Sequence, residues 1–168
     1  MPSHYKGRRN TLRALNAYIN LARAADSLFG RMSAQLELSG LTLGQFGVLE
    51  ALLHLGPMCQ HVIGQKLLRS GGNITLVVDN LEKYGWVKRE RQEDDRRKLM
   101  VHLTPEGRKL IEHVFPGHAK AIEREMDVLS PQEQESLRSF CRKLGRGGKT
   151  SREEQRRKEK QNDTDSTK

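Results

Sequence analysis

The chain has few cysteines, few aromatic residues and no long apolar stretch. Its 168 residues include two cysteines and 5% aromatic side chains. Cys59 and Cys141 have neither a CxxC partner nor the spacing of a disulfide framework, which favours a reducing compartment over secretion. No run of 18 apolar residues is present, so we expect no membrane span. These absences together predict a cytoplasmic globular protein.

The N-terminal segment is basic but lacks the apolar centre of a secretory signal. Polar residues between Asn16 and Asp26 interrupt every candidate core of such a signal. An arginine-rich and acid-poor start also fits a transit peptide, but a structural helix over the same residues explains it better.

Positive charge exceeds negative charge, and the excess is unevenly placed. The formal net charge is +9, with the basic excess in residues 1–31, 83–98 and 145–168 and a near-neutral body between them. Lysine and arginine neutralise phosphates and provide most of the sequence-independent affinity for nucleic acid. The distribution favours a polyanionic partner, although on charge alone a solvated basic surface fits equally well.

Apolar periodicity predicts three helices in the first 70 residues. They run from about residue 10 to about Gln35, from the capping box Thr42–Gln45 to Gly56-Pro57, and over residues 62–68. Gly30 is expected to weaken the first helix midway, since glycine disfavours a helix interior.

A fourth helix and two strands follow. Ile74, Val77, Val78 and Leu81 recur at the helical spacing i, i+3, i+4 and i+7, and Gly85 ends the pattern. Extended residues then flank a polar tip over residues 92–97. On the return strand Leu99, Val101 and Leu103 alternate with polar or less apolar neighbours, which predicts a half-buried strand.

The C-terminal third is predicted to be helical. Thr104-Pro105 gives an N-cap followed by proline, so a fifth helix begins where the return strand ends. Pro116-Gly117 is expected to kink or interrupt this helix, because proline removes a backbone donor. The capping box Ser130–Glu133 begins a last helix that ends at Gly145.

The order of these elements predicts the fold class. A short helix, a glycine-containing turn, a longer helix and a β-hairpin form a winged helix-turn-helix, here about residues 41–104. The protein is thus mainly α with a small β-wing. Helices at about 10–36 and 105–145 carry apolar residues that so small a module cannot cover, so we expect them to dimerise. Residues 10–145 form one domain, between a flexible basic arm (1–9) and a disordered charged tail (146–168).

An ordered set of residues along this region has the pattern of a known family. The set comprises Leu41-Thr42, Gln45-Phe46-Gly47-Val48-Leu49, Asn73-Ile74-Thr75, Val78-Asp79-Asn80-Leu81-Glu82, Gly85, Arg89, Asp95-Arg96-Arg97 and Leu103-Thr104-Pro105-Glu106-Gly107. It resembles the MarR family of bacterial winged helix-turn-helix transcription regulators, over roughly residues 10–145. Residues 70–82 and 115–118 resemble the branch that includes quinone- and phenol-responsive repressors. The resemblance implies a homodimer that binds a palindromic operator in double-stranded DNA and usually represses.

The fourth helix supplies the candidate major-groove residues. Its start at Ser70 presents unpaired amides to a phosphate, and its exposed side chains can reach base edges. The expected contacts are Ser70, Asn73, Thr75, Leu76 and Asn80, with Leu76 placed for a thymine methyl. Ser70 and Asn73 would equally serve as simple helix caps.

The hairpin tip supplies the candidate minor-groove residues. By the resemblance, Arg97 enters the minor groove and Asp95 orients it, which limits the rotamer entropy lost on binding. Arg96 and Lys98 are assigned to phosphates, and the alternative is an ordinary solvated tip. On the outgoing strand, either Arg89 with Arg91 or Lys88 with Glu90 can face DNA, and the pattern alone leaves this choice open.

Effector and redox sites are also expected from the resemblance. A small aromatic or phenolic ligand would lie between the dimer helices and the winged lobe, against Tyr18, Phe46, His54, Met58 and His113. Each of these residues would equally serve as core. Cys59 begins the third helix, whose first-turn amides favour a reactive thiolate, while an inert buried thiol is the alternative.

Other site classes find little support. His113 and His118 are five residues apart, unlike the i, i+4 pairs that ligate zinc, so we expect neither a metal nor a cofactor. No catalytic signature or phosphate loop is present, and we expect no enzyme. The remaining alternative to a specific regulator is an architectural protein that binds any duplex.

Overall fold

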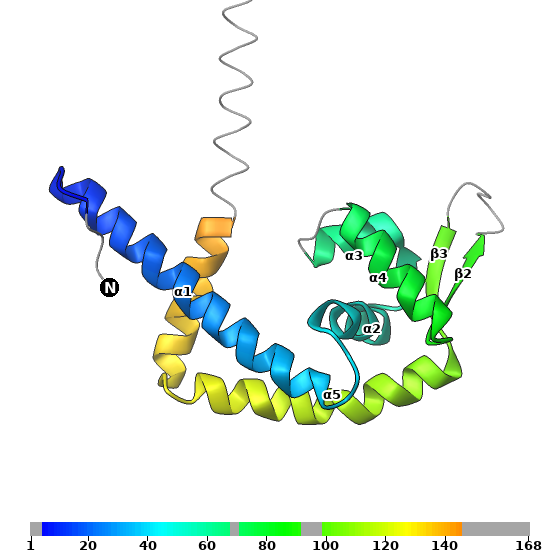
Figure 1. Cartoon of the computed structure of the whole chain (residues 1–168). Coiled ribbons are helices and arrows are strands. Elements are labelled where there is room, and N and C mark those ends of the chain that lie inside the picture. Colours follow the sequence, from blue (N-terminus) through cyan, green and yellow to red (C-terminus); the bar gives the residue numbers. More distant parts are fainter. Residues whose placement is uncertain (1–4, 68–70, 92–98, 146–168) are drawn as a thin grey trace, which may run out of the picture. The chain divides into compact units, whose positions relative to one another are not determined.

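A computed structural model describes residues 5–67, 71–91 and 99–145 of the chain. The chain divides after Glu123 into two compact units, each described by itself below. Within the first unit, Figure 1 shows short helices gathered beside a small sheet. The predicted single domain over residues 10–145 stays a prediction. Among the described residues, no helix is long and apolar enough to cross a membrane.

Helix α1 (Arg9–Glu37) confirms the predicted first helix and runs through Gly30 without a break. Its buried residues, Met32 and Leu36, lie near its C-terminal end. Farther toward the N-terminus the apolar side chains are half-buried or exposed, with Tyr18 69% exposed. Only the last turns of α1 are therefore held by the core of the first unit.

Helix α2 (Leu43–Leu55) begins and ends at the predicted signals. The Thr42 hydroxyl accepts from the backbone N–H of Gln45 at 3.2 Å, and the Gln45 side-chain oxygen accepts from the N–H of Thr42 at 2.9 Å. These reciprocal bonds satisfy two amides that lack helical partners. The C-cap Gly56 has a φ of +77°, which glycine adopts without a Cβ penalty.

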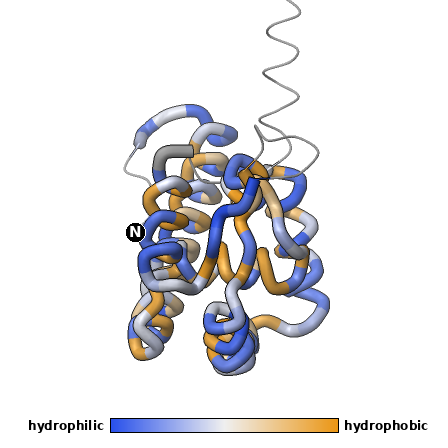
Figure 2. Tube along the Cα trace, turned by 90° about the vertical axis from the view of Figure 1, so that its right-hand side faces the viewer, coloured by the Kyte–Doolittle hydropathy of each residue, from blue (hydrophilic) through white to orange (hydrophobic). Residues whose placement is uncertain are grey.

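In the core of the first unit, α4 (Gly71–Lys83) packs against α2, and α3 (Gln60–Lys66) packs against α4. All three predicted helices of the helix-turn-helix are thus present. Figure 2 shows hydrophobic and hydrophilic residues interspersed along the described part of the chain. The fully buried side chains of this core include Val48, Leu49, Ile63, Ile74, Val78, Leu81, Val101 and Ile111.

The sheet has three antiparallel strands in the order β1-β3-β2, one more than the predicted hairpin. Strand β2 (Val87–Arg91) pairs with β3 (Leu99–Leu103), and β1 (Met58–Cys59) pairs with the other edge of β3. A two-residue strand has no detectable period, so the sequence alone does not reveal β1. The predicted alternation on β3 is wrong at Leu99, which is 42% exposed because it lies at the tip end, opposite Arg91.

A short joint connects the sheet to α5 (Pro105–Met126), as the Thr104-Pro105 pair predicted. The Thr104 N–H donates to the Trp86 carbonyl at 3.1 Å, and its hydroxyl donates to the Gly85 carbonyl at 2.7 Å. The same hydroxyl accepts from the Gly107 N–H at 3.0 Å, which caps α5. The first turn of α5 is therefore fixed to the end of α4 and the start of β2.

Helix α5 continues through Pro116, so of the two predicted outcomes, a kink or an interruption, the interruption is wrong. Proline removes one donor, which leaves the carbonyl four residues earlier without its helical partner. Pro116 and Glu112 are exposed, and water can satisfy that carbonyl. The buried residues Ile111, Val114 and His118 occupy another face and hold both halves of the helix against the core.

The second unit contains a helix over residues 131–145 that begins at the predicted capping box. The Ser130 N–H donates to Glu133 Oε2 at 2.8 Å, and the Glu133 N–H donates to Ser130 Oγ at 3.4 Å. Three apolar side chains of this helix, Leu137, Phe140 and Leu144, are 37%, 63% and 64% exposed. The predicted tail, residues 146–168, lies outside the described residues.

Candidate nucleic-acid interface

Helix α4 presents three different faces. One face carries Ile74, Val78 and Leu81, which are fully buried against α2, α3 and the sheet. The second carries Thr75, Asp79 and Glu82 at spacing i, i+4 and i+7, and the polar contacts described next hold it. A third face, at i, i+3, i+7 and i+10, is exposed. The exposed stripe of α4 consists of Asn73, Leu76, Asn80 and Lys83.

Arg89 on β2 ties the second face of α4 to the wing. Its guanidinium donates to Glu82 Oε2 at 2.6 Å and also to Asp79, while its backbone N–H donates to Glu82 Oε1 at 2.9 Å. The Arg89 side chain is only 16% exposed. A planar guanidinium with several donors can join two carboxylates in this way, whereas an ammonium acts as a single point charge.

The same contacts extend to α3. Arg89 donates to the side-chain oxygen of Gln60 at 3.2 Å, and the Gln60 amide donates to the Thr75 hydroxyl at 2.6 Å. These five residues, the Arg89 cluster (Gln60, Thr75, Asp79, Glu82 and Arg89), join α3, α4 and β2. Thr75 therefore lies within this cluster rather than on the exposed stripe.

The Arg89 charge is stabilised in place. Partial burial alone would lower the pKa of Arg89, but hydrogen bonds and Coulomb attraction from Asp79 and Glu82 outweigh it and raise this pKa above its ordinary value. Arg89 therefore stays protonated at any pH at which the protein is folded. The single positive charge of Arg89 consequently offsets one of the two negative charges that Asp79 and Glu82 add to α4.

The choice left open on β2 is now partly decided. Arg89 is turned toward α4 and is not available to DNA, and Lys88 and Glu90 lie on the opposite face, paired at 2.5 Å. His102 Nε2 on the neighbouring strand lies 3.6 Å from Glu90. Arg91 is exposed at the tip end of the strand. Of the two pairs, Lys88 and Glu90 are exposed together, whereas Arg89 and Arg91 have different environments.

Only some of the residues predicted to contact DNA lie in the described part of the chain. Asn73, Leu76 and Asn80 come together on the exposed stripe, where Leu76 is 63% exposed. The other predicted contacts, Ser70, Asp95, Arg96, Arg97 and Lys98, lie outside the described residues.

Comparison with known proteins places this geometry in a family. The model of the MarR family matches residues 41–99. The uncharacterized HTH-type transcriptional regulator YkoM of Bacillus subtilis is 37% identical over 133 residues, which span 79% of this chain and 86% of the relative. The HTH-type transcriptional regulator MhqR of the same organism is 34% identical, over 83% of this chain and 96% of the relative.

The chain belongs to the MarR family. Sco3205, a MarR family transcriptional regulator from Streptomyces coelicolor solved in complex with DNA, has the same fold. The two superpose with a TM-score of 0.76 at 24% identity, over 86% of this chain and 92% of that one. The relatives are described as transcriptional regulators rather than enzymes.

The predicted effector residues of this MarR-family chain divide into two groups. Phe46 stacks parallel to Phe115 with ring centroids 6.4 Å apart, and His54 meets Phe115 edge-on at 4.8 Å. Phe46 and His54 thus share Phe115 as a neighbour. Met58 on β1 is buried in the same core as Phe46, whereas Tyr18 is exposed on α1 and His113 is exposed on α5.

His118 is the aromatic-cluster residue that sequence reasoning missed. Its ring lies 4.3 Å from that of Phe46, and its Nδ1 lies 2.9 Å from Gln35 Oε1. Because a carbonyl oxygen only accepts, the ring donates from Nδ1. The side chain is 4% exposed. His118 follows Ile111 by seven residues and Val114 by four, so helical periodicity places it on the buried face of α5. This periodicity could have predicted its burial.

Burial controls the charge of His118. It lowers the pKa of this imidazole, and attraction from Glu50 offsets the effect only in part. The neutral ring is therefore the native form, at the point where α1, α2 and α5 meet.

Stability is expected to fall in mild acid through this residue. Below an ordinary histidine pKa of about 6.5 the unfolded state binds a proton that folded His118 resists, so acidification favours unfolding until the folded pKa is passed. Unfolding by urea at pH 7.5 and 5.5 should show a smaller loss of free energy in His118→Gln than in wild type. His113→Gln, on the exposed side of α5, should keep the wild-type loss, and equal losses in all three proteins would contradict this role.

Cys59 lies at the start of α3, as predicted. It is the N-cap of that helix and a residue of β1, it is half-buried, and its Sγ lies 3.3 Å from Met100 Sδ on β3. Its thiol makes no capping hydrogen bond to α3. Cys141 is exposed on the helix over residues 131–145. Among the described residues no group of three or more His, Cys, Asp or Glu side chains is placed to hold a metal.

Proposed function

We propose that this MarR-family protein is a sequence-specific DNA-binding transcription repressor that acts as a homodimer on a palindromic operator. The observation that carries the proposal is the Arg89 cluster. It fixes α3, α4 and β2 relative to one another through side-chain contacts of 2.6 to 3.2 Å and leaves the exposed stripe of α4 free. A helix held at a fixed angle beside a wing is the arrangement that reads a major groove.

The exposed stripe has the chemistry for base readout. Asn73 and Asn80 carry amides that can pair with adenine edges, and Leu76 offers an apolar contact for a thymine methyl. Ser70 would bind a phosphate at the start of the helix. In the wing, Arg97 would enter the minor groove with Asp95 orienting it, and Arg96 and Lys98 would contact phosphates. In this proposal α4 reads the DNA sequence, and the wing fixes the position of the protein on the duplex.

Exposed apolar side chains support the dimer. Tyr18 and Phe29 on α1 are 69% and 56% exposed, and Phe140 and Leu144 in the second unit are 63% and 64% exposed. Large side chains in such number are ordinarily covered by a partner. A twofold dimer presents two identical wings, and its operator is then palindromic with half-sites about one helical turn apart.

Competition between operator and random duplex tests the proposal. Fluorescence anisotropy at several salt concentrations should show a large preference for a palindrome selected from a random library, and Arg97→Ala should weaken binding to it by about 1–3 kcal/mol. Sedimentation should show that this variant is still dimeric. Equal affinity for every duplex at physiological salt would instead identify an architectural DNA-binding protein.

We also propose that a small aromatic or phenolic ligand, or an oxidant, releases the operator. The aromatic cluster of Phe46, His54 and Phe115 lies between α2 and α5, where a planar ligand would alter the contact of α5 with the winged lobe. Phenols, quinones and peroxide should be screened for release of operator DNA. Loss of the response in Cys59→Ser but not in Cys141→Ser would indicate thiol chemistry, and retention in both would indicate ligand binding.

A further inference from the structure

The N-terminal end of α1 carries positive charge without any compensating acid. The first 25 residues contain Lys6, Arg8, Arg9, Arg13 and Arg23, and the first acidic residue of the chain is Asp26. We name Lys6, Arg8, Arg9 and Arg13 the basic end of α1. In these 25 of 168 residues every charged side chain is thus cationic, while the body of the first unit is close to neutral.

This charge lies where helix physics disfavours it. The aligned peptide dipoles place partial positive charge at a helix N-terminus, so acidic residues are favoured there and cations are not. Arg8 is the N-cap of α1 and makes no side-chain capping bond, and the first turn contains no acidic residue. The helices that begin after Thr42 and Ser130 follow the usual rules, since each starts with a capping box. The start of α1 deviates from this pattern.

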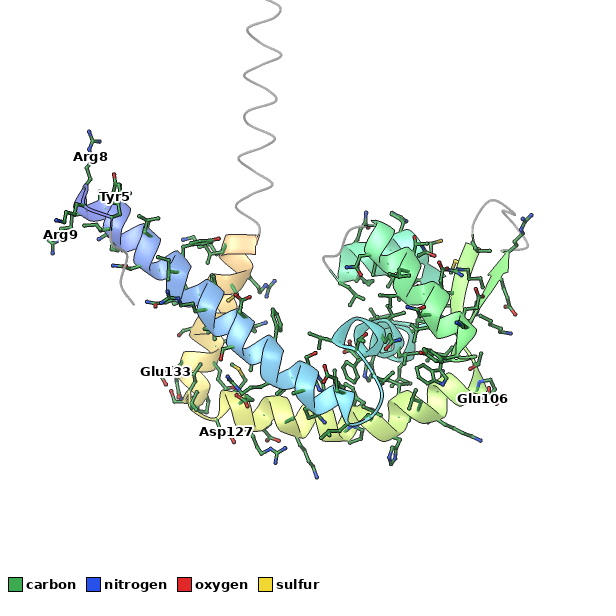
Figure 3. All side chains as sticks on the ribbon, in the orientation of Figure 1. Tyr5, Arg8, Arg9, Glu106, Asp127 and Glu133 are labelled. Atoms are coloured by element: carbon green, nitrogen blue, oxygen red, sulfur yellow. The ribbon has the colours of Figure 1, made fainter. Side chains whose placement is uncertain are left out.

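The side chains of the basic end are available to a partner. In the described part of the chain, Arg8 and Arg9 form no ion pair and no side-chain hydrogen bond, and Arg13 reaches only Asn10, at 3.2 Å. Figure 3 shows Arg8 and Arg9 projecting away from the end of the helix. Along α1 they lie roughly 40 Å from buried Leu36, at 1.5 Å of rise per residue. No part of the described core uses these charges.

We propose that the basic end of α1 binds backbone phosphates of duplex DNA outside the sequence that α4 reads. This inference rests on the proposed function, which supplies the DNA. Arginines placed against the helix dipole reduce local stability in the free protein, and a bound phosphate removes that cost while gaining charge-assisted hydrogen bonds. A segment without acids also meets no repulsion from a polyanion, which carries one charge per about 1.7 Å of duplex.

The test compares a double variant with a charge-matched control in the full-length protein. Arg8→Gln/Arg9→Gln removes two charges from the basic end, and Arg108→Gln/Lys109→Gln removes two exposed charges from α5. Dissociation constants are measured against salt on two duplexes, one holding only the operator and one with about 20 extra base pairs on each side. Each lost phosphate contact should reduce the log–log salt slope by about 0.9.

The expected result is a slope reduced by about 2 or more for Arg8→Gln/Arg9→Gln on the long duplex and unchanged on the short one. Its Tm should equal or exceed that of wild type, since the removed charges opposed the dipole. The α5 control should show no difference between the duplexes. Equal slopes for wild type and the Arg8/Arg9 variant on the long duplex would overturn the proposal.

Two further arms of the experiment vary the anion and the DNA sequence. Vesicles of phosphatidylserine and phosphatidylcholine test whether the anion is a lipid surface. Vesicle binding that depends on Arg8 and Arg9, with an unchanged DNA slope, would also overturn the proposal. Repeating the measurement on a short and a long duplex of random sequence makes the test independent of operator recognition. If wild type shows no operator preference, the proposed function fails, and a length-dependent slope difference on random DNA still supports the basic end as a phosphate-binding surface.

Discussion

Replacing Gly107 with alanine is expected to destabilise the protein by about 3 kcal/mol or more, at the upper end of what overpacking costs. A Cβ built on Gly107 would lie 1.9 Å from the Trp86 carbonyl oxygen and 2.7 Å from its carbonyl carbon. Both atoms belong to the backbone, and that carbonyl accepts the Thr104 N–H. Neither partner can rotate away, so α5 must move off the sheet or the joint must open.

Gly117 provides the matched control on the same helix. A Cβ there would meet nothing within 4 Å, and alanine is the better helix former by roughly 1 kcal/mol. Gly117→Ala should therefore be neutral or stabilising. Urea unfolding at one fixed protein concentration measures both variants. Trp86, the only tryptophan, lies in the joint, so its fluorescence reports directly on this contact. A Gly107→Ala protein with the wild-type midpoint would show that the joint is not rigid.

The joint also has a functional consequence. It ties the first turn of α5 to Gly85 and Trp86, at the place where α4 ends and β2 begins. Any ligand that shifts α5 must therefore act on the wing and on α4 together. A Gly107→Ala protein that remains folded should bind operator more weakly, because its wing is displaced relative to α5.

Local signals in the sequence predicted the helix boundaries well. Thr42 with Gln45, Gly56, Gly85 and Ser130 with Glu133 each act through bonds or backbone angles within a few residues. Such signals are complete in the sequence itself, because every participating atom is close along the chain. The family resemblance was likewise confirmed, since it rests on an ordered series of these local patterns.

Features that depend on distant partners were not predicted. Strand β1 exists only because Met58 and Cys59 lie beside Val101 and Met100, about forty residues later. Helix α5 passes through Pro116 because buried residues on another face hold it, which a local rule for proline cannot include.

The residues of the candidate site also divide into those that local patterns predicted and those whose contacts depend on distant parts of the chain. Asn73, Leu76 and Asn80 were correctly placed on an exposed face by periodicity alone. The sequence presents Arg89 only as a member of one of two pairs that could face DNA, since its contact with Asp79 and Glu82 requires the wing to fold back on α4. His118 has the periodicity of a buried residue, but its spacing from His113 drew attention to metal binding instead.

Replacing Arg89 with methionine is expected to reduce both stability and operator affinity. Methionine retains much of the volume but none of the donors, and it leaves Asp79 and Glu82 facing each other. Hydrogen bonds to charged groups contribute about 1.5–3 kcal/mol each, yet Asp79 and Glu82 are 52% and 39% exposed, so solvent screens part of their repulsion. We expect a loss of about 2 kcal/mol in the free energy of unfolding and at least a tenfold loss of operator affinity.

Arg91→Met provides the control, because Arg91 is an exposed residue of the same strand outside the Arg89 cluster. It should leave the free energy of unfolding nearly unchanged and weaken binding only through its charge, equally on operator and random duplex. Arg89→Met should instead lose the preference for operator, since α4 and the wing no longer share a fixed angle. Arg89→Lys should recover the charge but not the planar fork, and should lie between the two. Normal operator preference in Arg89→Met would show that packing of α4 alone sets its angle, and that the cluster neutralises charge without positioning the helix.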